Sequence, residues 1–409
     1  MNQLSGGNMG SVKQKNRAAI LRSIRRSGGM SRVALSTATG LSKGGLTPLV
    51  EELLALGLIQ ETQTEPTAGG RRPIRLEICP DRCQVIALDW TRKAMRVALV
   101  DFKGALSHTS QRPAEGLSRE AALRQLRDML LPLKAQGRQV IGISVVAPGP
   151  LNPETGMLLS PPNFGGLRNV PIKSWLEEHL CLPVFLDNNA SAHALAEKDY
   201  GHGLAHESFL HVVVDDGIGG AMITDGGLYR GAMGSELGHM TIQHDGPLCP
   251  CGNTGCAELY ASIPALLAFL SQESRKPVQS WEETLPRLLR ADLVNFRVLE
   301  QEAAYLSSLL VSAVNLLAPQ AVVLGSQLAD LGALISRPLE AALRQRCFYR
   351  EAQDIPVLCS TLESPSLRGG ASLVFESFLS GGLGSYEAVL GGFRSPTDRQ
   401  PLSTEPVFL

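Results

Sequence analysis

Apolar residues recur every three or four positions over residues 12–26, and this spacing predicts an amphipathic helix with basic residues around its other faces. Two glycines end the pattern, and two further short helical patterns follow. Ser31 and Ser42 precede them, and serine commonly caps a helix N-terminus. Residues 58–76 then read as a strand, a loop and a strand. Three short helices followed by a β-hairpin are the order of a winged helix-turn-helix domain, which we expect over residues 1–80.

The hydrophobic period changes after this hairpin. Continuous apolar runs such as 85–88, 97–100 and 139–146 predict buried strands, and helical patterns lie between several of the later ones. This alternation predicts an α/β body over residues 81–380, with ligand-binding loops at strand ends. Residues 381–409 are rich in glycine, serine and proline, so we expect a disordered tail there.

Charge is unevenly distributed along the chain. Residues 1–80 carry 11 basic and 5 acidic side chains, a net charge of +6, whereas the rest of the 409-residue chain carries −7. A basic module on an acidic body is typical of a nucleic-acid-binding head joined to a second function. No run approaches the roughly 18–20 apolar residues of a membrane span, and the N-terminus lacks the apolar core of a signal peptide. We therefore expect a soluble, cytoplasmic protein without a membrane partner.

The candidates for DNA contact lie near the starts of the second and third predicted helices and at the tip of the hairpin. A Gly-Gly-Arg-Arg-Pro tip could enter a minor groove, and basic or hydroxyl side chains at helix starts could reach phosphates. The residues are Arg32, Ser42, Lys43, Thr47, Arg71 and Arg72. The alternative interpretation is a small helical domain with a solvated basic face.

Pro48 complicates the predicted recognition helix. In a helix that begins at Lys43, the proline ring would clash with the carbonyl of Gly44 and would remove a backbone hydrogen bond. We therefore expect this helix to begin late, near Thr47, or to be kinked.

The cysteines supply a metal-binding pattern. His239, Cys249, Cys251 and Cys256 form H-x9-C-x-C-x4-C, and three thiolates with one imidazole make a closed set that suits structural zinc. The alternative is three reduced cysteines beside an unrelated histidine. His244 is a second candidate for the fourth ligand.

A set of polar residues falls near the ends of predicted strands. Carboxylates and amides that converge can bind sugar hydroxyls, but isolated Asn and Glu residues at loop ends are more often turn formers. The set comprises Asn163, Asp187, Asn188, Asn189, Glu236, His239 and Glu258. Spacing alone does not decide between these interpretations.

The chain resembles the ROK family (repressors, open reading frames and sugar kinases). Within that family it is similar to winged-helix repressors of sugar metabolism, of the glucose/N-acetylglucosamine and xylose regulator types. The resemblance covers roughly residues 12–379. The segments that carry it are NRAAILRSIRRSGGMSR, TGLSKGGLTPLVEELLALGLI, GGRRP, SELGHMTI and GPLCPCGNTGCAE.

The resemblance implies an actin/hexokinase-like body of two lobes with a sugar between them. The family's sugar-contacting positions fall on Asn163, Asn188, Glu236, His239 and Glu258, and Asn189 lies beside them. His239 would then be both a zinc ligand and a sugar contact.

The chain departs from the family's kinases at three places. Asn189 stands where a kinase has the Asp that accepts the sugar proton, and an amide cannot act as that base. Residues 89–93 lack the glycines of the first phosphate loop, and residues 215–220 place two aspartates in the second. Asp187 could replace the missing base, but it would restore neither loop. We therefore expect no enzymatic activity.

These features predict a transcriptional regulator, and specifically a repressor of carbohydrate genes that senses a sugar or sugar phosphate. Its expected partners are double-stranded operator DNA and a second copy of the chain, in a homodimer or homotetramer with heads on a palindromic site. Two alternatives stay open. One is an ATP-dependent sugar kinase with a fused head, and the other is a regulator controlled by a sugar-transport (phosphotransfer-system) protein.

Overall fold

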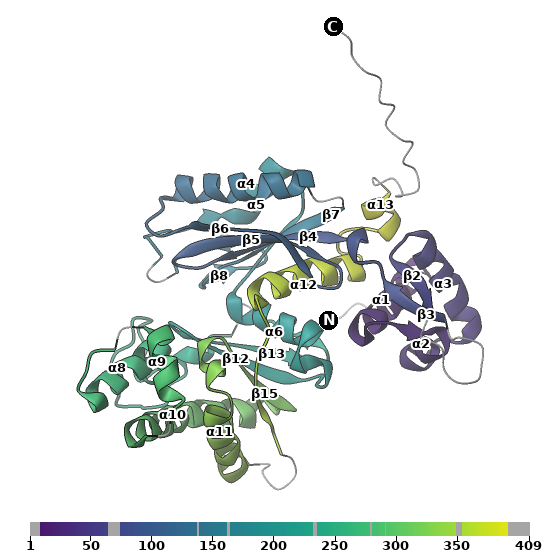
Figure 1. Cartoon of the computed structure of the whole chain (residues 1–409). Helices are drawn as coiled ribbons and strands as arrows, with labels where there is room; N and C mark the ends of the chain where they lie inside the picture. Colours follow the sequence, from purple (N-terminus) through teal and green to yellow (C-terminus); the bar gives the residue numbers. More distant parts are fainter. Residues whose placement is uncertain are drawn as a thin grey trace, which may run out of the picture.

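The computed structural model describes residues 9–63, 74–136, 139–161, 164–231, 235–278, 280–290, 292–348 and 354–391. These residues form an N-terminal head beside a body of two lobes, each built on a five-stranded sheet (Figure 1). None of the described helices is long and apolar enough to cross a membrane.

The head contains three helices and a small sheet. The helices are α1 (Met9–Ser27), α2 (Arg32–Thr39) and α3 (Lys43–Ala55). The strands are β1 (Met30–Ser31), β2 (Ile59–Gln63) and β3 (Ile74–Ile78), in the order β1-β3-β2. This arrangement confirms the predicted winged helix-turn-helix. Arg71 and Arg72, at the predicted wing tip, lie outside the described residues.

The start of α3 corrects the expectation of a late helix. Ser42 is its N-cap, with Oγ accepting a hydrogen bond from the Gly45 N–H at 3.2 Å, and α3 begins at Lys43 with Pro48 inside it. The first turn is closed ahead of the proline, since Leu46 N–H bonds Ser42 O at 2.9 Å and the Thr47 hydroxyl donates to the Lys43 carbonyl.

The upper lobe carries the first body sheet, in the order β11-β7-β4-β5-β6. Its strands are β4 (Gln84–Trp90), β5 (Ala94–Asp101), β6 (Leu106–Pro113), β7 (Val140–Val146) and β11 (Val184–Asp187). Alternate residues of β4 and β5 face opposite sides. One side packs against α4 (Arg119–Gln136) and α5 (Ile172–Leu180), and the other against α12 (Pro365–Ser380). The short strands β8 (Leu151–Asn152), β9 (Met157–Leu158) and β10 (Val170–Pro171) form a separate small sheet.

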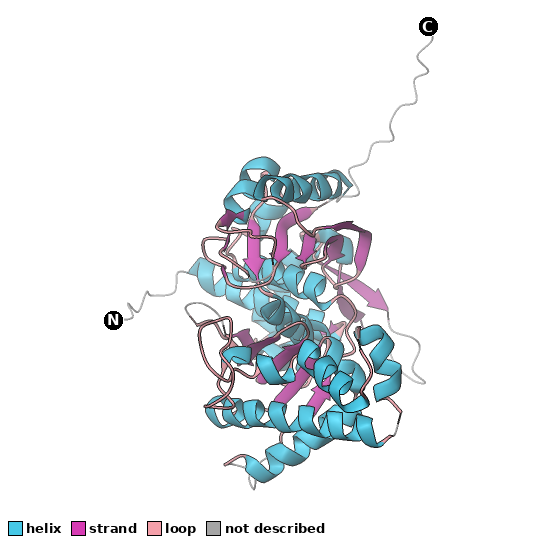
Figure 2. Ribbon diagram, turned by 90° about the vertical axis from the view of Figure 1, so that its left-hand side faces the viewer, coloured by secondary structure: helices cyan, strands magenta, loops and turns pink. Residues whose placement is uncertain are grey.

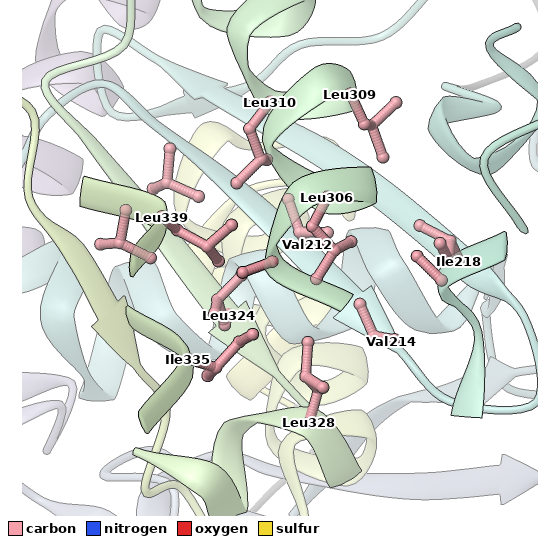
Figure 3. Close-up of a cluster of buried hydrophobic side chains, with 14 of the residues drawn as sticks. Val212, Val214, Ile218, Leu306, Leu309, Leu310, Leu324, Leu328, Ile335 and Leu339 are labelled. Atoms are coloured by element: carbon pink, nitrogen blue, oxygen red, sulfur yellow. The ribbon is translucent and has the colours of Figure 1, made fainter. Parts of the chain in front are cut away.

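The lower lobe carries the second sheet, in the order β14-β13-β12-β15-β16. Its strands are β12 (Phe209–Val214), β13 (Ile218–Thr224), β14 (Gly227–Leu228), β15 (Ala321–Gly325) and β16 (Val357–Cys359). One face packs against α6 (Asn189–Tyr200). The other forms an aliphatic core with a helical layer (Figure 3). This layer contains α7 (Glu258–Ala261), α8 (Ile263–Ser274), α9 (Trp281–Leu288), α10 (Leu293–Leu317) and α11 (Ala333–Arg346).

Helices α6 and α12 lie between the two sheets, and Figure 2 shows helices separating the two groups of strands. They approach closely because Gly369 of α12 lies against the backbone of Ala192, where any side chain at residue 369 would collide with the Ala192 carbonyl. The lobes therefore share a two-helix connection.

The head does not have a core of its own. Ile20 and Ile24 of α1 belong to the same buried cluster as Phe375 and Phe378 of α12. Helix α13 (Tyr386–Leu390) joins this cluster through a fully buried tyrosine, Tyr386. The expected disorder from residue 381 is therefore wrong for residues 381–391. Residues 392–409 lie outside the described part of the chain.

Glu302 of α10 is buried in the lower lobe, and its Oε1 has no hydrogen-bond partner among the described residues. Burial raises the pKa of this carboxyl to about 8, because the charged form loses its hydration. Between the ordinary pKa of a glutamate and about pH 8, the folded state therefore keeps a proton on Glu302 that the unfolded chain releases. This contribution to stability is complete at low pH and is lost as the pH rises toward 8.

We expect Glu302→Gln to remove this pH dependence. Between about pH 5 and about pH 7.5, the free energy of unfolding of the variant should rise by about 3 kcal/mol relative to the original protein. Urea unfolding at several pH values measures the difference. Glu300→Gln, at an exposed position on the same helix, is the control and should give a constant difference. A constant difference for Glu302→Gln as well would contradict the assignment.

Candidate functional site

The structure brings together the four residues of the predicted metal site. One ligand atom from each of His239, Cys249, Cys251 and Cys256 lies within 4.8 Å of the other three. His239 Nδ1 is 3.7 Å from Cys249 Sγ, and Cys251 Sγ is 3.7 Å from Cys256 Sγ. Tetrahedral zinc requires sulfurs about 3.8 Å apart and a sulfur and nitrogen about 3.6 Å apart. The four donors therefore fit a zinc ion.

The chain around these residues, the knuckle (residues 239–256), is held by its own backbone. Cys249 N–H bonds Asn253 O at 2.7 Å, and Ile242 N–H bonds Gly255 O at 2.9 Å. Gly255 has a φ of +67° and leaves no room for a side chain beside the Gln243 carbonyl. The rival ligand, His244, is 93% exposed and lies outside the cluster.

The knuckle also positions two carboxylates. His239 ends the short 3-10 turn Leu237–His239 that follows Glu236, and Glu258 begins α7 directly after the last cysteine. Glu236 is accessible to solvent, yet desolvation by its surroundings raises its pKa, and the negative charge of nearby Glu258 adds to this while His239 opposes it. Because His239 directs Nδ1 toward the thiols, Nε2 is left for a ligand.

The start of α6 forms the other part of the site. Asn188 is the N-cap, and its Oδ1 accepts from Ser191 N–H at 2.8 Å, so its amide NH₂ can still donate. Asn189 Oδ1 accepts from Ala190 N–H at 3.0 Å. Asn163 lies outside the described residues.

One series of contacts connects the knuckle side of the site to α6, and another contact connects it to the upper lobe. Glu258 Oε2 accepts from Ile218 N–H at 3.0 Å, and the neighbouring Gly219 packs on Ala190 of α6. On the upper-lobe side, Glu236 lies near Gly149, in the loop that follows β7. We call Asp187, Asn188, Asn189, Glu236, His239 and Glu258 the interlobe site.

Asp187 is not free to replace the missing base. It is buried, its Oδ1 accepts from Asn188 N–H at 2.9 Å, and its Oδ2 pairs with Arg230 Nη2 at 2.5 Å. Arg230 follows β14 of the lower lobe, so this ion pair crosses between the lobes. The sequence analysis missed Arg230, because no spacing rule connects it to Asp187.

A second ion pair crosses between the lobes where the kinase phosphate loops would lie. Arg92, in the β4–β5 turn, contacts Asp216, in the β12–β13 turn, at 3.0 Å. Burial raises the pKa of the adjacent Asp215 to about 6, and the nearby carboxylates of Asp216 and Asp330 contribute. Asp89, near the end of β4, is buried and paired with Arg96 of β5. The β4–β5 turn and the β12–β13 turn therefore both carry charged side chains of the protein itself.

The DNA-contact candidates that the structure describes lie on the head. Ser42, Lys43 and Thr47 are exposed at the start of α3. Arg32 pairs with Glu61 of β2 at 2.6 Å, which ties α2 to the hairpin. Nothing in the described residues covers the start of α3.

The ROK family model matches residues 85–377. The xylose repressor of Bacillus subtilis (strain 168) is 30% identical over 376 residues, which span 90% of this chain and 97% of the relative. The DNA-binding transcriptional repressor Mlc of Escherichia coli (strain K12) is 27% identical over 399 residues, which span 92% of this chain and 97% of the relative.

Solved structures agree on the fold. A ROK family transcriptional regulator, described as a homologue of the E. coli MLC protein, has a TM-score of 0.78 at 24% identity, and the match covers 93% of this chain and 100% of that chain. The ROK hexokinase of Thermus thermophilus has a TM-score of 0.63 at 29% identity, covering 72% of this chain and 98% of that chain. The family thus includes kinases as well as repressors. Because its model spans well over half of the sequence and named repressors align along most of it, the chain belongs to the ROK family.

Proposed function

We propose that this protein is a sugar-responsive transcriptional repressor that binds operator DNA through its head and a sugar or sugar phosphate at the interlobe site. The observation that carries the proposal is the shared core. The head is packed against the body that contains the interlobe site, so a change in the body can be passed to the head through their shared contacts. The two relatives described above align over at least 90% of the chain and are named repressors, and one of them is a xylose repressor.

DNA binding rests on the exposed start of α3. Lys43 would neutralise a phosphate, and Ser42 and Thr47 would donate hydrogen bonds, with Arg32, Arg71 and Arg72 as flanking contacts. Because DNA half-sites repeat about one helical turn apart, two heads of a homodimer or homotetramer would read a palindrome.

Sugar binding rests on the convergence of donors and acceptors at the interlobe site. Glu236, Glu258 and His239 Nε2 would bind hydroxyl groups, and the amides of Asn188 and Asn189 would add donors. Asn163 completes the proposed set by family resemblance.

Phosphoryl transfer is disfavoured by the same geometry. Asn189 cannot accept a proton, and Asp187 is already held by Arg230. The carboxylates of Asp215 and Asp216 would repel the phosphates of ATP. We therefore propose that the protein senses the sugar without phosphorylating it. A sugar-transport protein remains the alternative effector, and the first experiment distinguishes it.

Zinc is the proposed occupant of the knuckle. A closed Cys₃His set leaves no open coordination position, so the ion would act structurally. It would fix the His239 ring and place Glu236 and Glu258 on either side of it.

The first experiment measures operator binding by fluorescence anisotropy at fixed salt, using DNA from upstream of the protein's own gene or, if that fails, a site selected from random DNA. We expect one sugar among D-xylose, D-glucose, N-acetyl-D-glucosamine and their phosphates to weaken binding about 5- to 150-fold.

The Glu236→Gln variant should retain DNA binding and lose most of the sugar response in the same assay, because the substitution removes a charged hydrogen-bond acceptor.

Three outcomes contradict parts of this proposal. Tight DNA binding that no sugar changes would favour control by a protein partner. Absence of any specific DNA site would remove the repressor assignment. Sugar-dependent ATP hydrolysis or phosphate transfer by the purified protein would show that it is a kinase.

We expect the Cys249→Ser variant to lose close to one equivalent of bound zinc. Its melting temperature should also fall, by roughly 2–4 °C for each kcal/mol of unfolding free energy that is lost. The sugar response should fall with it, because His239 and Glu258 lose their anchor. Elemental analysis and calorimetry measure both effects. Cys181→Ser, at an exposed cysteine outside the knuckle, is the control. Unchanged zinc content in the Cys249 variant would refute the site.

A further inference from the structure

Arg25 of α1 is buried where the head meets the body. Its side chain is 6% exposed, and Nη1 pairs with Asp199 Oδ2 at 2.9 Å. Nε donates to the Phe102 carbonyl at 3.1 Å, and Nη2 donates to the Tyr200 hydroxyl. The guanidinium also lies 5.1 Å from the ring centres of Tyr200 and Phe375. All three guanidinium nitrogens therefore have partners, and the group is fixed in one position.

Asp199 connects three helices at this point. It belongs to the last turn of α6, it holds Arg25 of α1, and its Oδ2 accepts a hydrogen bond from the Ser372 hydroxyl of α12 at 2.6 Å. Burial alone would raise the pKa of Asp199, but Arg25 and Lys198 lower it below its ordinary value. The pair is therefore ionised. Separating it would leave the buried Arg25 guanidinium without its carboxylate, whereas Asp199 would keep Lys198 at 3.4 Å, so the separation is unfavourable mainly for Arg25.

Helix α6 extends from this joint to the interlobe site. Its N-cap is Asn188, and Asp187 just before it is held by Arg230 of the lower lobe. The 12 residues of α6 span about 18 Å at 1.5 Å per residue. A shift of the Asn188 end therefore displaces the Asp199 end, because the helix between them is regular and buried.

Helix α1 carries the displacement on to the DNA-binding surface. Arg26 donates to the carbonyls of Gly203 and Leu204, in the 3-10 turn (His202–Leu204) that follows α6, at 3.1 and 2.7 Å. Toward the other end of α1, Arg17 Nε bonds Glu52 of α3 at 2.9 Å. One helix thus contacts both the end of α6 and the recognition helix.

We propose that Arg25 is the positioning residue that couples the interlobe site to the DNA-binding head. Sugar binding moves the lobes about α6 and α12, and the Arg25–Asp199–Tyr200 joint transmits this movement to α1 and α3. This inference rests on the proposed function, because it concerns the regulation of the same site.

A nearby ion pair provides a matched control. Arg22, also on α1, pairs with Glu376 of α12 at 2.9 Å, but the two side chains are 44% and 27% exposed. Solvated pairs of this kind are weak and adjust to small movements. Arg22→Gln therefore removes an arginine from the same helix without disturbing the buried joint.

The experiment compares the full-length protein with Arg25→Gln, Arg25→Lys, Tyr200→Phe and Arg22→Gln. Operator affinity is measured with and without the sugar that acts on the original protein, drawn from D-xylose, D-glucose, N-acetyl-D-glucosamine and their phosphates. The quantity of interest is the ratio of the two affinities. Sugar affinity in the absence of DNA is measured separately by calorimetry. A purely structural defect would change the sugar affinity as well as the ratio, whereas a loss of coupling would change the ratio alone.

We expect Arg25→Gln to bring the ratio to within about twofold of 1 while sugar affinity stays within about threefold of the original, because coupling is a free energy separate from either binding. Arg25→Lys and Tyr200→Phe should retain part of the ratio, and Arg22→Gln should retain all of it. If Arg25→Gln fails to fold, Tyr200→Phe decides, since it removes one hydrogen bond without stranding a charge.

The failures are distinguishable. A ratio of 1 for the original protein would overturn the proposed function and this inference with it. A normal ratio for the original protein that is unchanged in the Arg25→Gln and Tyr200→Phe variants would overturn the joint alone. An equal loss in Arg22→Gln would assign the coupling to the α1–α12 surface in general and would overturn the role of Arg25.

Discussion

Helices α6 and α12 cross at the point where Gly369 lies against the backbone of Ala192, and both lobes are built outward from this crossing. One face of α6 packs on the lower sheet, while α12 packs on the upper sheet and against α1. A larger residue at position 369 would force the helices apart. The relative placement of the lobes, the interlobe site and the head all depends on this close contact.

Two ion pairs cross between the lobes. Arg92–Asp216 and Arg230–Asp187 each join an upper-lobe turn or strand end to a lower-lobe loop. Both pairs lie between the lobes, so the relative position of the lobes is held in part by charges of the protein itself.

The knuckle and the two carboxylates beside it, Glu236 and Glu258, form one structural unit. His239 belongs to the cluster through Nδ1. Glu236 and Glu258 flank the cluster in the sequence, so a metal that fixes the knuckle also fixes both carboxylates.

The sequence by itself determined the winged head, the α/β body and the Cys₃His cluster, because each depends on local periodicity, capping serines or short spacing. It did not predict α13 as ordered, because its glycine-rich surroundings resemble a tail and only burial of Tyr386 against α12 orders it. Nor did it predict that α3 begins at Lys43 and continues through Pro48. Tertiary structure alone decided the pairings of Arg25 with Asp199 and of Arg230 with Asp187. These partners lie 174 and 43 residues apart, and no local pattern specifies which distant charges will be buried together.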